Sequence, residues 1–277
     1  ISTNPPDFSA RARGRMKIHP TAIVHPKAEL ADDVEIQPYV VIGPKVRIGA
    51  GTVIGSHCVI SGDTVIGERN VFSPGSQIGI RSQDLKHDDK LDGKLRIGND
   101  NIIRECVTLS TNTMRNPDEV DRVTSIGNHN FLMCFVHVGH DCYICNHIVI
   151  ATYTGMSFHV DIDDHANVFG LVALHQHIRI GSYSFVGGMS RITKDCLPYM
   201  LTADIPTRCH GPNSVGLRRA GIDKEARARV KNIYRLLCRS NLNTTQAVAG
   251  IRSSVEDSPE RNYLLEFIET SKRGVTK

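Results

Sequence analysis

The chain has 277 residues, of which 40% are hydrophobic and only 5% are aromatic, and its formal net charge at pH 7 is +4. This mild positive excess allows anionic partners but does not require a nucleic acid, and we expect none. No stretch approaches the ~18 uninterrupted apolar residues of a membrane-spanning helix, so we expect no integral membrane segment.

Residues 1–15 precede the patterned part of the chain and begin with Ile rather than Met. They carry Arg11, Arg13 and Arg15 but a single acidic residue, Asp7. A basic leader that is poor in acids is typical of an organelle transit peptide, so we expect the remnant of such a peptide and a location in the mitochondrial matrix. An ordinary terminal tail is the equal alternative, and the compartment would then be the bacterial cytoplasm.

Between residues 16 and 195 an apolar residue recurs every six positions. The first run of this ladder is Ile18, Val24, Leu30, Ile36, Ile42, Ile48, Ile54, Ile60, Ile66, Phe72 and Ile78. The ladder resumes at Ile97, Ile103 and Leu109, and then runs from Ile126 to Ile192. This period fits neither a helix nor an ordinary strand and is typical of a solenoid. Three six-residue sides would close a triangular coil, so residues about 18 apart should stack on successive coils.

Two polar stretches interrupt the ladder, at 79–96 and 110–125, and loops this long in a repeat protein usually carry function. After residue 195 the period is lost. Three prolines between 196 and 212 indicate a linker, and helical patterns follow it. The N-caps expected for three helices are Asp223, Thr244 and Ser258, the last followed by Pro259. We therefore predict a leader at 1–15, a parallel β-helix at 16–195, and a linker with a C-terminal helical domain at 196–277.

A group of histidines lies within the repeat, and their side chains could take part in catalysis or metal binding. His140 and His159 are 19 residues apart, and His159 and His175 are 16 apart, so stacking predicts that all three line one face. His137 should lie near the same edge. Such a cluster could bind zinc through neutral imidazoles. It could also provide a general base, His140, whose imidazole the adjacent Asp141 would orient.

Other histidines and the cysteines have plainer interpretations. We expect His57, His147 and His165 to be surface or corner residues. Cys142 and Cys145 have the spacing of a zinc or redox pair, but Cys142 falls four residues after a ladder position, as other cysteines do, and no second pair completes a zinc site. The eight cysteines are scattered through a large chain, which predicts free thiols in a reducing compartment.

Several segments together carry a resemblance to a known family. They are the ladder, His137–Cys142, Ile103–Thr108, Gln83–Lys86 and Gly216–Arg219. From about residue 16 to its C-terminus the chain resembles the UDP-N-acetylglucosamine O-acyltransferases, the family of the first enzyme of lipid A synthesis. The resemblance implies a left-handed parallel β-helix, which is an exception to the right-handed rule for crossovers, assembled as a homotrimer. It also implies transfer of an (R)-3-hydroxyacyl group from acyl carrier protein to the 3-hydroxyl of UDP-N-acetylglucosamine, without a metal or cofactor.

The resemblance matches His140 with the general base and Asp141 with its partner. The substrate-binding residues that it implies are Asp84, Lys86, His137, His159, His175, Gln176, Asn213 and Arg219. Gly188 stands where a bulkier residue shortens the acyl groove in some relatives, so a long acyl chain is expected. The chain departs from the family pattern at Ser110, Phe158 and Val215, where a histidine, a glycine and an acid respectively are common in relatives.

Three alternatives remain open at this point. An N-acyltransferase of the same pathway shares the repeat, but it usually carries an extra N-terminal domain, and only about 15 residues precede the ladder here. A gamma-type carbonic anhydrase would need three histidines that converge on zinc. A purely structural β-helix has little reason to line a groove with histidines.

Overall fold

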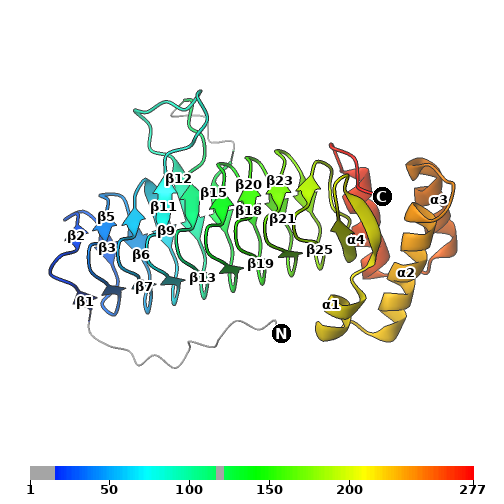
Figure 1. The fold of residues 1–277 in the computed structure, drawn as a ribbon, viewed down its shortest axis with the longest axis horizontal. Coiled ribbons are helices and arrows are strands. Elements are labelled where there is room, and N and C mark those ends of the chain that lie inside the picture. Colours follow the sequence, from blue (N-terminus) through cyan, green and yellow to red (C-terminus); the bar gives the residue numbers. More distant parts are fainter. Residues whose placement is uncertain (1–15, 117–121) are drawn as a thin grey trace.

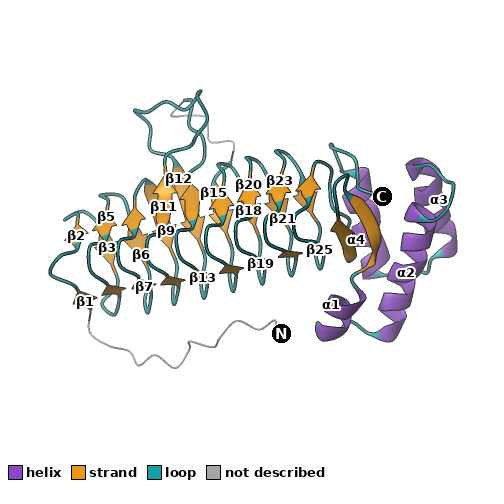
Figure 2. Cartoon of the chain, viewed as in Figure 1, coloured by secondary structure: helices purple, strands orange, loops and turns teal. Residues whose placement is uncertain are grey.

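The computed structural model describes residues 16–116 and 122–277. The leader on which the transit-peptide prediction depends, and part of the second polar loop, lie outside the described residues. Figure 1 shows an elongated prism of short strands, with one group of loops projecting from its side and helices gathered at one end. Figure 2 shows the same division, with strands along the prism and helices at its C-terminal end.

Three parallel sheets form the faces of the prism. The first has 11 strands, β1 (Lys17–Ile18), β4 (Glu35–Ile36), β7 (Val53–Ile54), β10 (Val71–Phe72), β13 (Ile102–Ile103), β16 (Phe131–Leu132), β19 (Val149–Ile150), β22 (Asn167–Val168), β25 (Phe185–Val186), β27 (Met200–Ala203) and β28 (Arg208–Pro212). The second has nine, β2 (Ile23–Val24), β5 (Val41–Ile42), β8 (Val59–Ile60), β11 (Gln77–Ile80), β14 (Thr108–Ser110), β17 (His137–Val138), β20 (Gly155–Met156), β23 (Ala173–Leu174) and β26 (Arg191–Ile192). The third has eight, β3 (Glu29–Leu30), β6 (Arg47–Ile48), β9 (Asp63–Ile66), β12 (Lys94–Ile97), β15 (Thr124–Ile126), β18 (Tyr143–Ile144), β21 (Asp161–Ile162) and β24 (Arg179–Ile180).

From β4 to β26, each strand pairs in parallel with the strand three before it in the chain. Ile36 pairs with Ile18 on one side and Ile54 on the other, so a regular coil contains 18 residues. The ladder residues point inward, and from Ile36 to Ile192 nearly all of them are buried in one continuous core. The predicted left-handed parallel β-helix with C-terminal helices is confirmed, and the six-residue period is its cause, because each period forms one side of the triangle.

The corners of the coils need a left-handed backbone conformation. In many coils a residue other than glycine adopts it, for example His57, His147 and His165, with φ between 57° and 61°. Equivalent corner rings stack on one another, and the rings of His147 and His165 are 4.8 Å apart. These three histidines are therefore corner residues, as predicted. Stacking offsets part of the strain that a side chain costs in this conformation.

The two polar loops emerge where the ladder breaks. They lengthen single coils, so that Phe72 pairs with Ile103 and Ile97 with Ile126. The first runs from residue 81 to 93 between β11 and β12, and the second begins after β14. The two loops contact each other, since the backbone N–H of Asp88 donates to the carbonyl oxygen of Met114 at 2.8 Å.

The ends of the prism differ. At the N-terminal end β1 has one neighbour, and Ile18 and Ile23 are 43% and 66% exposed. At the other end a second core, which includes Leu197, Met200 and Leu217, packs the helices onto the last coils. The helices are α1 (Ser214–Arg219), α2 (Lys224–Cys238), α3 (Thr244–Ser254) and α4 (Pro259–Glu269). None of the helices in the described ranges is both long and apolar enough to cross a membrane.

Two details of the C-terminal part differ from the sequence prediction. The segment 196–212, expected to be a linker, contains β27 and β28, which pair antiparallel and extend the 11-stranded sheet. Asp223 and Ser258 are N-caps as predicted, but α3 is capped by Asn243 rather than Thr244. The side chain of Gln246 accepts a hydrogen bond from the N–H of Asn243, and this reciprocal pair fixes the helix start one residue earlier.

Candidate active site

His140 and Asp141 lie at a corner directly after β17, and both are buried. Asp141 has a φ of 60°, and its Oδ2 lies 2.6 Å from Nδ1 of His140. An ionised carboxylate can only accept a hydrogen bond, so Nδ1 carries the proton and Nε2 is the basic nitrogen. The backbone N–H of Asp141 donates to Thr124 Oγ1 at 2.8 Å, which fixes the corner. The pair therefore has the geometry of an oriented general base.

Neighbouring coils add two further side chains. The ring of Phe158 stacks on His140 at 4.8 Å with 10° between the planes, so this departure from the family pattern fixes the plane of the imidazole. His159 Nε2 lies 3.8 Å from Asp141 Oδ2, which is beyond hydrogen-bond distance but close enough for an ion pair when the imidazole is protonated. Burial lowers the pKa of His159, against the opposing effect of the Asp141 carboxylate. His159 is therefore neutral over more of the acidic range than an exposed histidine.

His137 lies on the same face as the pair. Its Nδ1 is 2.7 Å from Thr108 Oγ1 on the preceding coil. Burial lowers the pKa of His137, and the nearby His140 lowers it further. Both effects favour the neutral form of His137, which can donate or accept hydrogen bonds without carrying a charge.

A cavity of about 850 Å³ opens beside His140. One wall is the outer face of β17, β20 and β23, and the other is formed by Asp84, Lys86 and Arg115 from the two loops. The backbone N–H of Lys86, 2.9 Å from Asp84 Oδ1, holds the pKa of that carboxyl below its usual range, and the guanidinium of Arg115 acts in the same direction. Ser110 also lines the cavity, and its buried Oγ has no hydrogen-bond partner among the residues that the structure describes.

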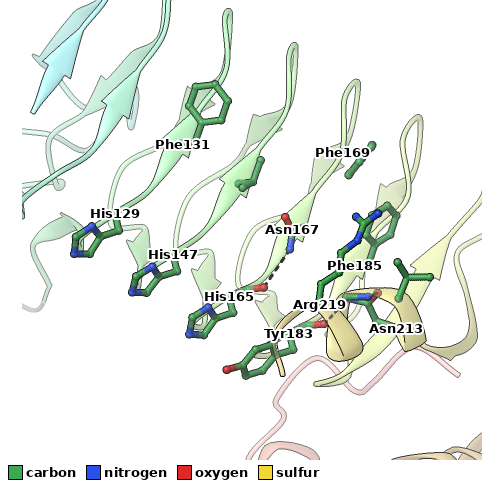
Figure 3. A pocket seen from close by; sticks show the side chains of 14 residues that line it. His129, Phe131, His147, His165, Asn167, Phe169, Tyr183, Phe185, Asn213 and Arg219 are labelled. Carbon is green, nitrogen blue, oxygen red and sulfur yellow. Dashed lines mark hydrogen bonds between the residues drawn. The ribbon is translucent and has the colours of Figure 1, made fainter. Parts of the chain in front are cut away.

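A second pocket, of about 390 Å³, lies between the outer face of the 11-stranded sheet and α1, and we call it the α1 pocket. Figure 3 shows a row of corner rings, His129, His147, His165 and Tyr183, with Arg219 opposite them. Asn213 Nδ2 donates to the carbonyl oxygen of Tyr183 at 3.0 Å, while Asn213 Oδ1 caps α1. Val215, where the family resemblance leads us to expect an acid, lines this pocket, so this position supplies no carboxylate.

Five of the predicted substrate-binding residues line one of these two places. Asp84, Lys86 and His137 line the cavity together with His140, Asn213 and Arg219 line the α1 pocket, and His159, His175 and Gln176 line neither. No residue of the set lines both. A ligand that contacts both groups in one chain would have to reach around an edge of the prism.

The prediction that His140, His159 and His175 line one face is only partly right. His140 and His159 meet at a ring separation of 6.0 Å. His175 follows Leu174, which pairs with Met156, so its position in the coil corresponds to that of Ser157 and not to that of His140. Its Nδ1 lies 3.2 Å from Arg273 of the C-terminal segment and 3.1 Å from the carbonyl oxygen of Gln176. Because 16 residues rather than 18 separate His159 from His175, His175 lies at a different position in its coil.

Gly188 also lies apart from the cavity residues. A Cβ added there would come within 3.2 Å of the carbonyl oxygen of Gly170 on the preceding coil. Gly155, by contrast, lines the cavity, and a Cβ added there would meet nothing within 4 Å. Sequence reasoning did not single out Gly155, because only the pairing of His137 with Gly155 reveals its position.

One cluster of side chains has a geometry that could bind a metal ion. Within the described ranges, the group that could supply three ligands is His140, Asp141 and His159, whose ligand atoms lie within 4.8 Å of one another. Cys142 is not part of it, since its buried thiol donates to the carbonyl oxygen of Ser157 at 3.1 Å. Cys58 makes the equivalent bond to Ser73, so Cys142 is a repeat position of the core, as predicted.

Comparison with known proteins identifies the family. The profile described as UDP N-acetylglucosamine O-acyltransferase, domain 2, matches residues 195–276, and the bacterial transferase hexapeptide profile matches residues 45–79. The acyl-[acyl-carrier-protein]–UDP-N-acetylglucosamine O-acyltransferase of Burkholderia lata is 45% identical over 265 residues, which cover 94% of this chain and 99% of the relative.

Solved structures agree with the sequence comparison. The UDP-N-acetylglucosamine acyltransferase of Francisella novicida has a TM-score of 0.89 and 34% identity, covering 94% of this chain and 93% of that one. The UDP-N-acetylglucosamine O-acyltransferase of Moraxella catarrhalis has a TM-score of 0.88 and 37% identity, covering 94% and 99%. Similarity at this level over both domains confirms the resemblance first seen in the histidine segment. The chain belongs to the UDP-N-acetylglucosamine O-acyltransferase family.

Proposed function

We propose that this acyltransferase moves an (R)-3-hydroxyacyl group from acyl carrier protein to the 3-hydroxyl of UDP-N-acetylglucosamine, the first step of lipid A synthesis. The observation that carries the proposal is the buried contact of 2.6 Å between His140 Nδ1 and Asp141 Oδ2 at the wall of a large cavity. It supplies what transfer from a thioester to an alcohol requires, which is an imidazole base held in one tautomer.

In this mechanism Nε2 of His140 removes the proton from the sugar hydroxyl as its oxygen attacks the thioester carbonyl. The Asp141 carboxylate stabilises the imidazolium that forms. Backbone N–H groups at the coil corners are the candidates to stabilise the tetrahedral oxyanion. When the intermediate collapses, the carbon–sulfur bond breaks and the imidazolium returns its proton to the leaving thiolate. No metal or cofactor takes part in this scheme, and that remains a prediction.

The nucleotide part of the substrate suits the α1 pocket. Arg219 can bind diphosphate oxygens with charge-assisted hydrogen bonds, and Asn213 is held rigidly beside it by its two hydrogen bonds. Because this pocket and the cavity lie on different faces of one prism, a single substrate would engage Arg219 of one copy and His140 of another. We therefore propose a homotrimer in which each cleft is completed by a neighbouring subunit, with His175 and Gln176 at its edge.

Acyl carrier protein is the proposed donor. The chain's formal charge of +4 favours approach of an acidic carrier, and Lys86 and Arg115 bring positive charge to the cavity mouth. A long acyl chain stays a prediction from the family resemblance, because Gly188 does not line the cavity and a Cβ there would lie 3.2 Å from the carbonyl oxygen of Gly170.

The proposal is tested by incubating the protein with UDP-N-acetylglucosamine and 3-hydroxyacyl carrier proteins of several chain lengths, and detecting the acylated nucleotide sugar by mass spectrometry. His140→Ala should lower the rate by about 10²–10⁴-fold, the usual contribution of a general base. The matched control is His57→Ala, which removes an exposed corner histidine of an earlier coil. Absence of product with every chain length contradicts the proposed reaction, and equal rates in His140→Ala and wild type contradict the role of His140.

The compartment is a separate proposal. The relatives named above are bacterial, which favours the bacterial cytoplasm and gives no support to the mitochondrial matrix predicted from the leader. Residues 1–15 fused to a fluorescent protein distinguish the two. Import of the fusion into mitochondria would support the matrix, and a diffuse signal would support the alternative.

A further inference from the structure

Thr113, in the second polar loop, contacts both members of the catalytic pair although it is far from them in sequence. Its Oγ1 lies 3.0 Å from Nδ1 of His140. Its backbone N–H donates to Oδ2 of Asp141 at 3.3 Å. One residue of a projecting loop therefore holds the imidazole and the carboxylate at the same time.

The hydrogen-bonding capacities of these atoms decide what Thr113 does. Nδ1 of His140 carries a proton because it lies against a carboxylate oxygen, so the Thr113 hydroxyl oxygen is a second acceptor for that proton. The Thr113 N–H in turn occupies a lone pair of the carboxylate and limits its rotation. When the Thr113 hydroxyl donates its proton to Ser82 Oγ, its oxygen can only accept from Nδ1–H, and the two contacts then disfavour the tautomer protonated at Nε2, in which His140 could not act as a base.

Thr113 is itself fixed by the first polar loop. Its Oγ1 lies 2.7 Å from Oγ of the fully buried Ser82, and Ser82 Oγ accepts a hydrogen bond from the N–H of Asp84 at 3.2 Å. In addition, the N–H of Met114 donates to Nδ1 of the buried His87 at 3.1 Å. A hydrogen-bonded chain thus connects the loop that carries Asp84 and Lys86 to the catalytic imidazole.

We propose that Thr113 is a positioning residue that keeps His140 in the Nδ1–H tautomer, with Ser82 fixing the Thr113 hydroxyl. The inference rests on the proposed function, in which His140 is the general base. It goes further by assigning a role to a loop residue that touches neither substrate nor reacting atom, and by connecting the order of both loops to the state of the base.

The test compares Thr113→Val, which keeps the shape and loses the hydroxyl, with Thr113→Ser, which keeps the hydroxyl. Thr113→Val should lower kcat by about tenfold to a hundredfold, the effect of one hydrogen bond to a charged group, with KM for the nucleotide sugar within about twofold. Thr113→Ser should recover most of the loss. Thr111→Val is the matched control, since Thr111 lies two residues before Thr113 and its buried hydroxyl has no hydrogen-bond partner within residues 16–116 and 122–277.

The pH profile separates positioning from general damage to the structure. The titratable groups around His140 are Asp141, His137, His159 and Asp84, and all remain in these variants. Loss of an acceptor at Nδ1 destabilises the imidazolium, so the acidic limb of kcat/KM should move to lower pH in Thr113→Val alone. If Thr113→Val melts well below wild type, Thr113→Ala takes its place, because it introduces no bulk.

A readout without substrate keeps this proposal separate from the proposed reaction. The ¹⁵N chemical shifts of the His140 ring, assigned by their loss in His140→Ala, report the tautomer directly. A wild-type ring protonated at Nδ1 that becomes mixed in Thr113→Val supports the positioning role even if sugar acylation fails. An unchanged tautomer, an unchanged kcat in Thr113→Val, or a Thr113→Ser variant as slow as Thr113→Val would each overturn it.

Discussion

The molecule uses histidine in two ways, and the contrast shows how a solenoid separates structure from chemistry. The corner histidines, His57, His129, His147 and His165, have positive φ and stack on rings of adjacent coils. The cavity-side histidines, His137, His140 and His159, also have polar partners, namely a threonine hydroxyl or the Asp141 carboxylate. Ring stacking and a corner position do not separate the groups, because His159 has a φ of 54° and stacks on the ring of His177; what separates them is the buried carboxylate of Asp141.

The strongest test of this contrast changes the carboxylate beside each kind of histidine. Asp141→Asn should lower kcat by about 10²–10⁴-fold, because an amide can hold His140 in the wrong tautomer and cannot stabilise the imidazolium. Asp100→Asn removes the carboxylate 4.0 Å from the corner residue His129, and kcat should stay within about twofold. Steady-state kinetics of both variants decide the matter, and comparable losses would remove the distinction between the two groups.

A smaller effect is expected from backbone strain at the corners. His57 has a φ of 60° and stacks on Tyr39 at 5.0 Å. His57→Val should lower the free energy of unfolding by about 1–2 kcal/mol, since a β-branched side chain tolerates this conformation poorly. His57→Gly, which relieves the strain but loses the stacking, should change it by less. Denaturant unfolding measures both, and a more stable His57→Val would mean that the corner conformation is not the constraint.

The smallest predicted effect is a pH dependence at the cavity. Burial lowers the pKa of His137, so below the unfolded-state pKa of about 6.5 the unfolded chain binds more protons than the native one. Stability from this residue is therefore present at neutral pH and is lost as the pH falls below that value. The decrease in Tm between pH 7 and pH 5 should be smaller in His137→Gln than in wild type. An NMR titration that gives His137 an ordinary or raised pKa would contradict this.

The fold was predictable because its cause is local. Each six-residue period, with its ladder residue such as Ile54 or Ile150, forms one side of a coil. A long run of such periods predicts the stacked coils, and only their handedness had to be inferred from the family resemblance. The helix caps Asp223 and Ser258 could be read from single residues for the same reason. The pairing of β27 with β28 could not, because their sequence has no six-residue period and it takes its conformation from the sheet edge that it covers.

The site was predictable only where it follows the ladder. His140 and Asp141 are adjacent in sequence, and His159 falls almost one coil later, so register alone brings them together. Thr113 contacts them from a loop that has no six-residue repeat, so its position could not be predicted from the sequence. Phe158 was recognisable in the sequence only as a departure from the family pattern, and its stacking on His140 became apparent from the structure. The division of the substrate-binding set between two faces likewise depends on the three-dimensional path of the coils.

The unequal ends of the prism have a consequence for how the enzyme loses structure. Within the described residues, the first coil pairs on one side only and leaves Ile18 and Ile23 exposed, whereas the helices cover the other end. In a one-dimensional array, we expect opening to start at the end that makes fewer contacts and to spread coil by coil. Several complete coils separate that end from β17, so the first coils can unfold before the coils around β17 do. We expect these coils to open and close again while the surroundings of His140 stay intact.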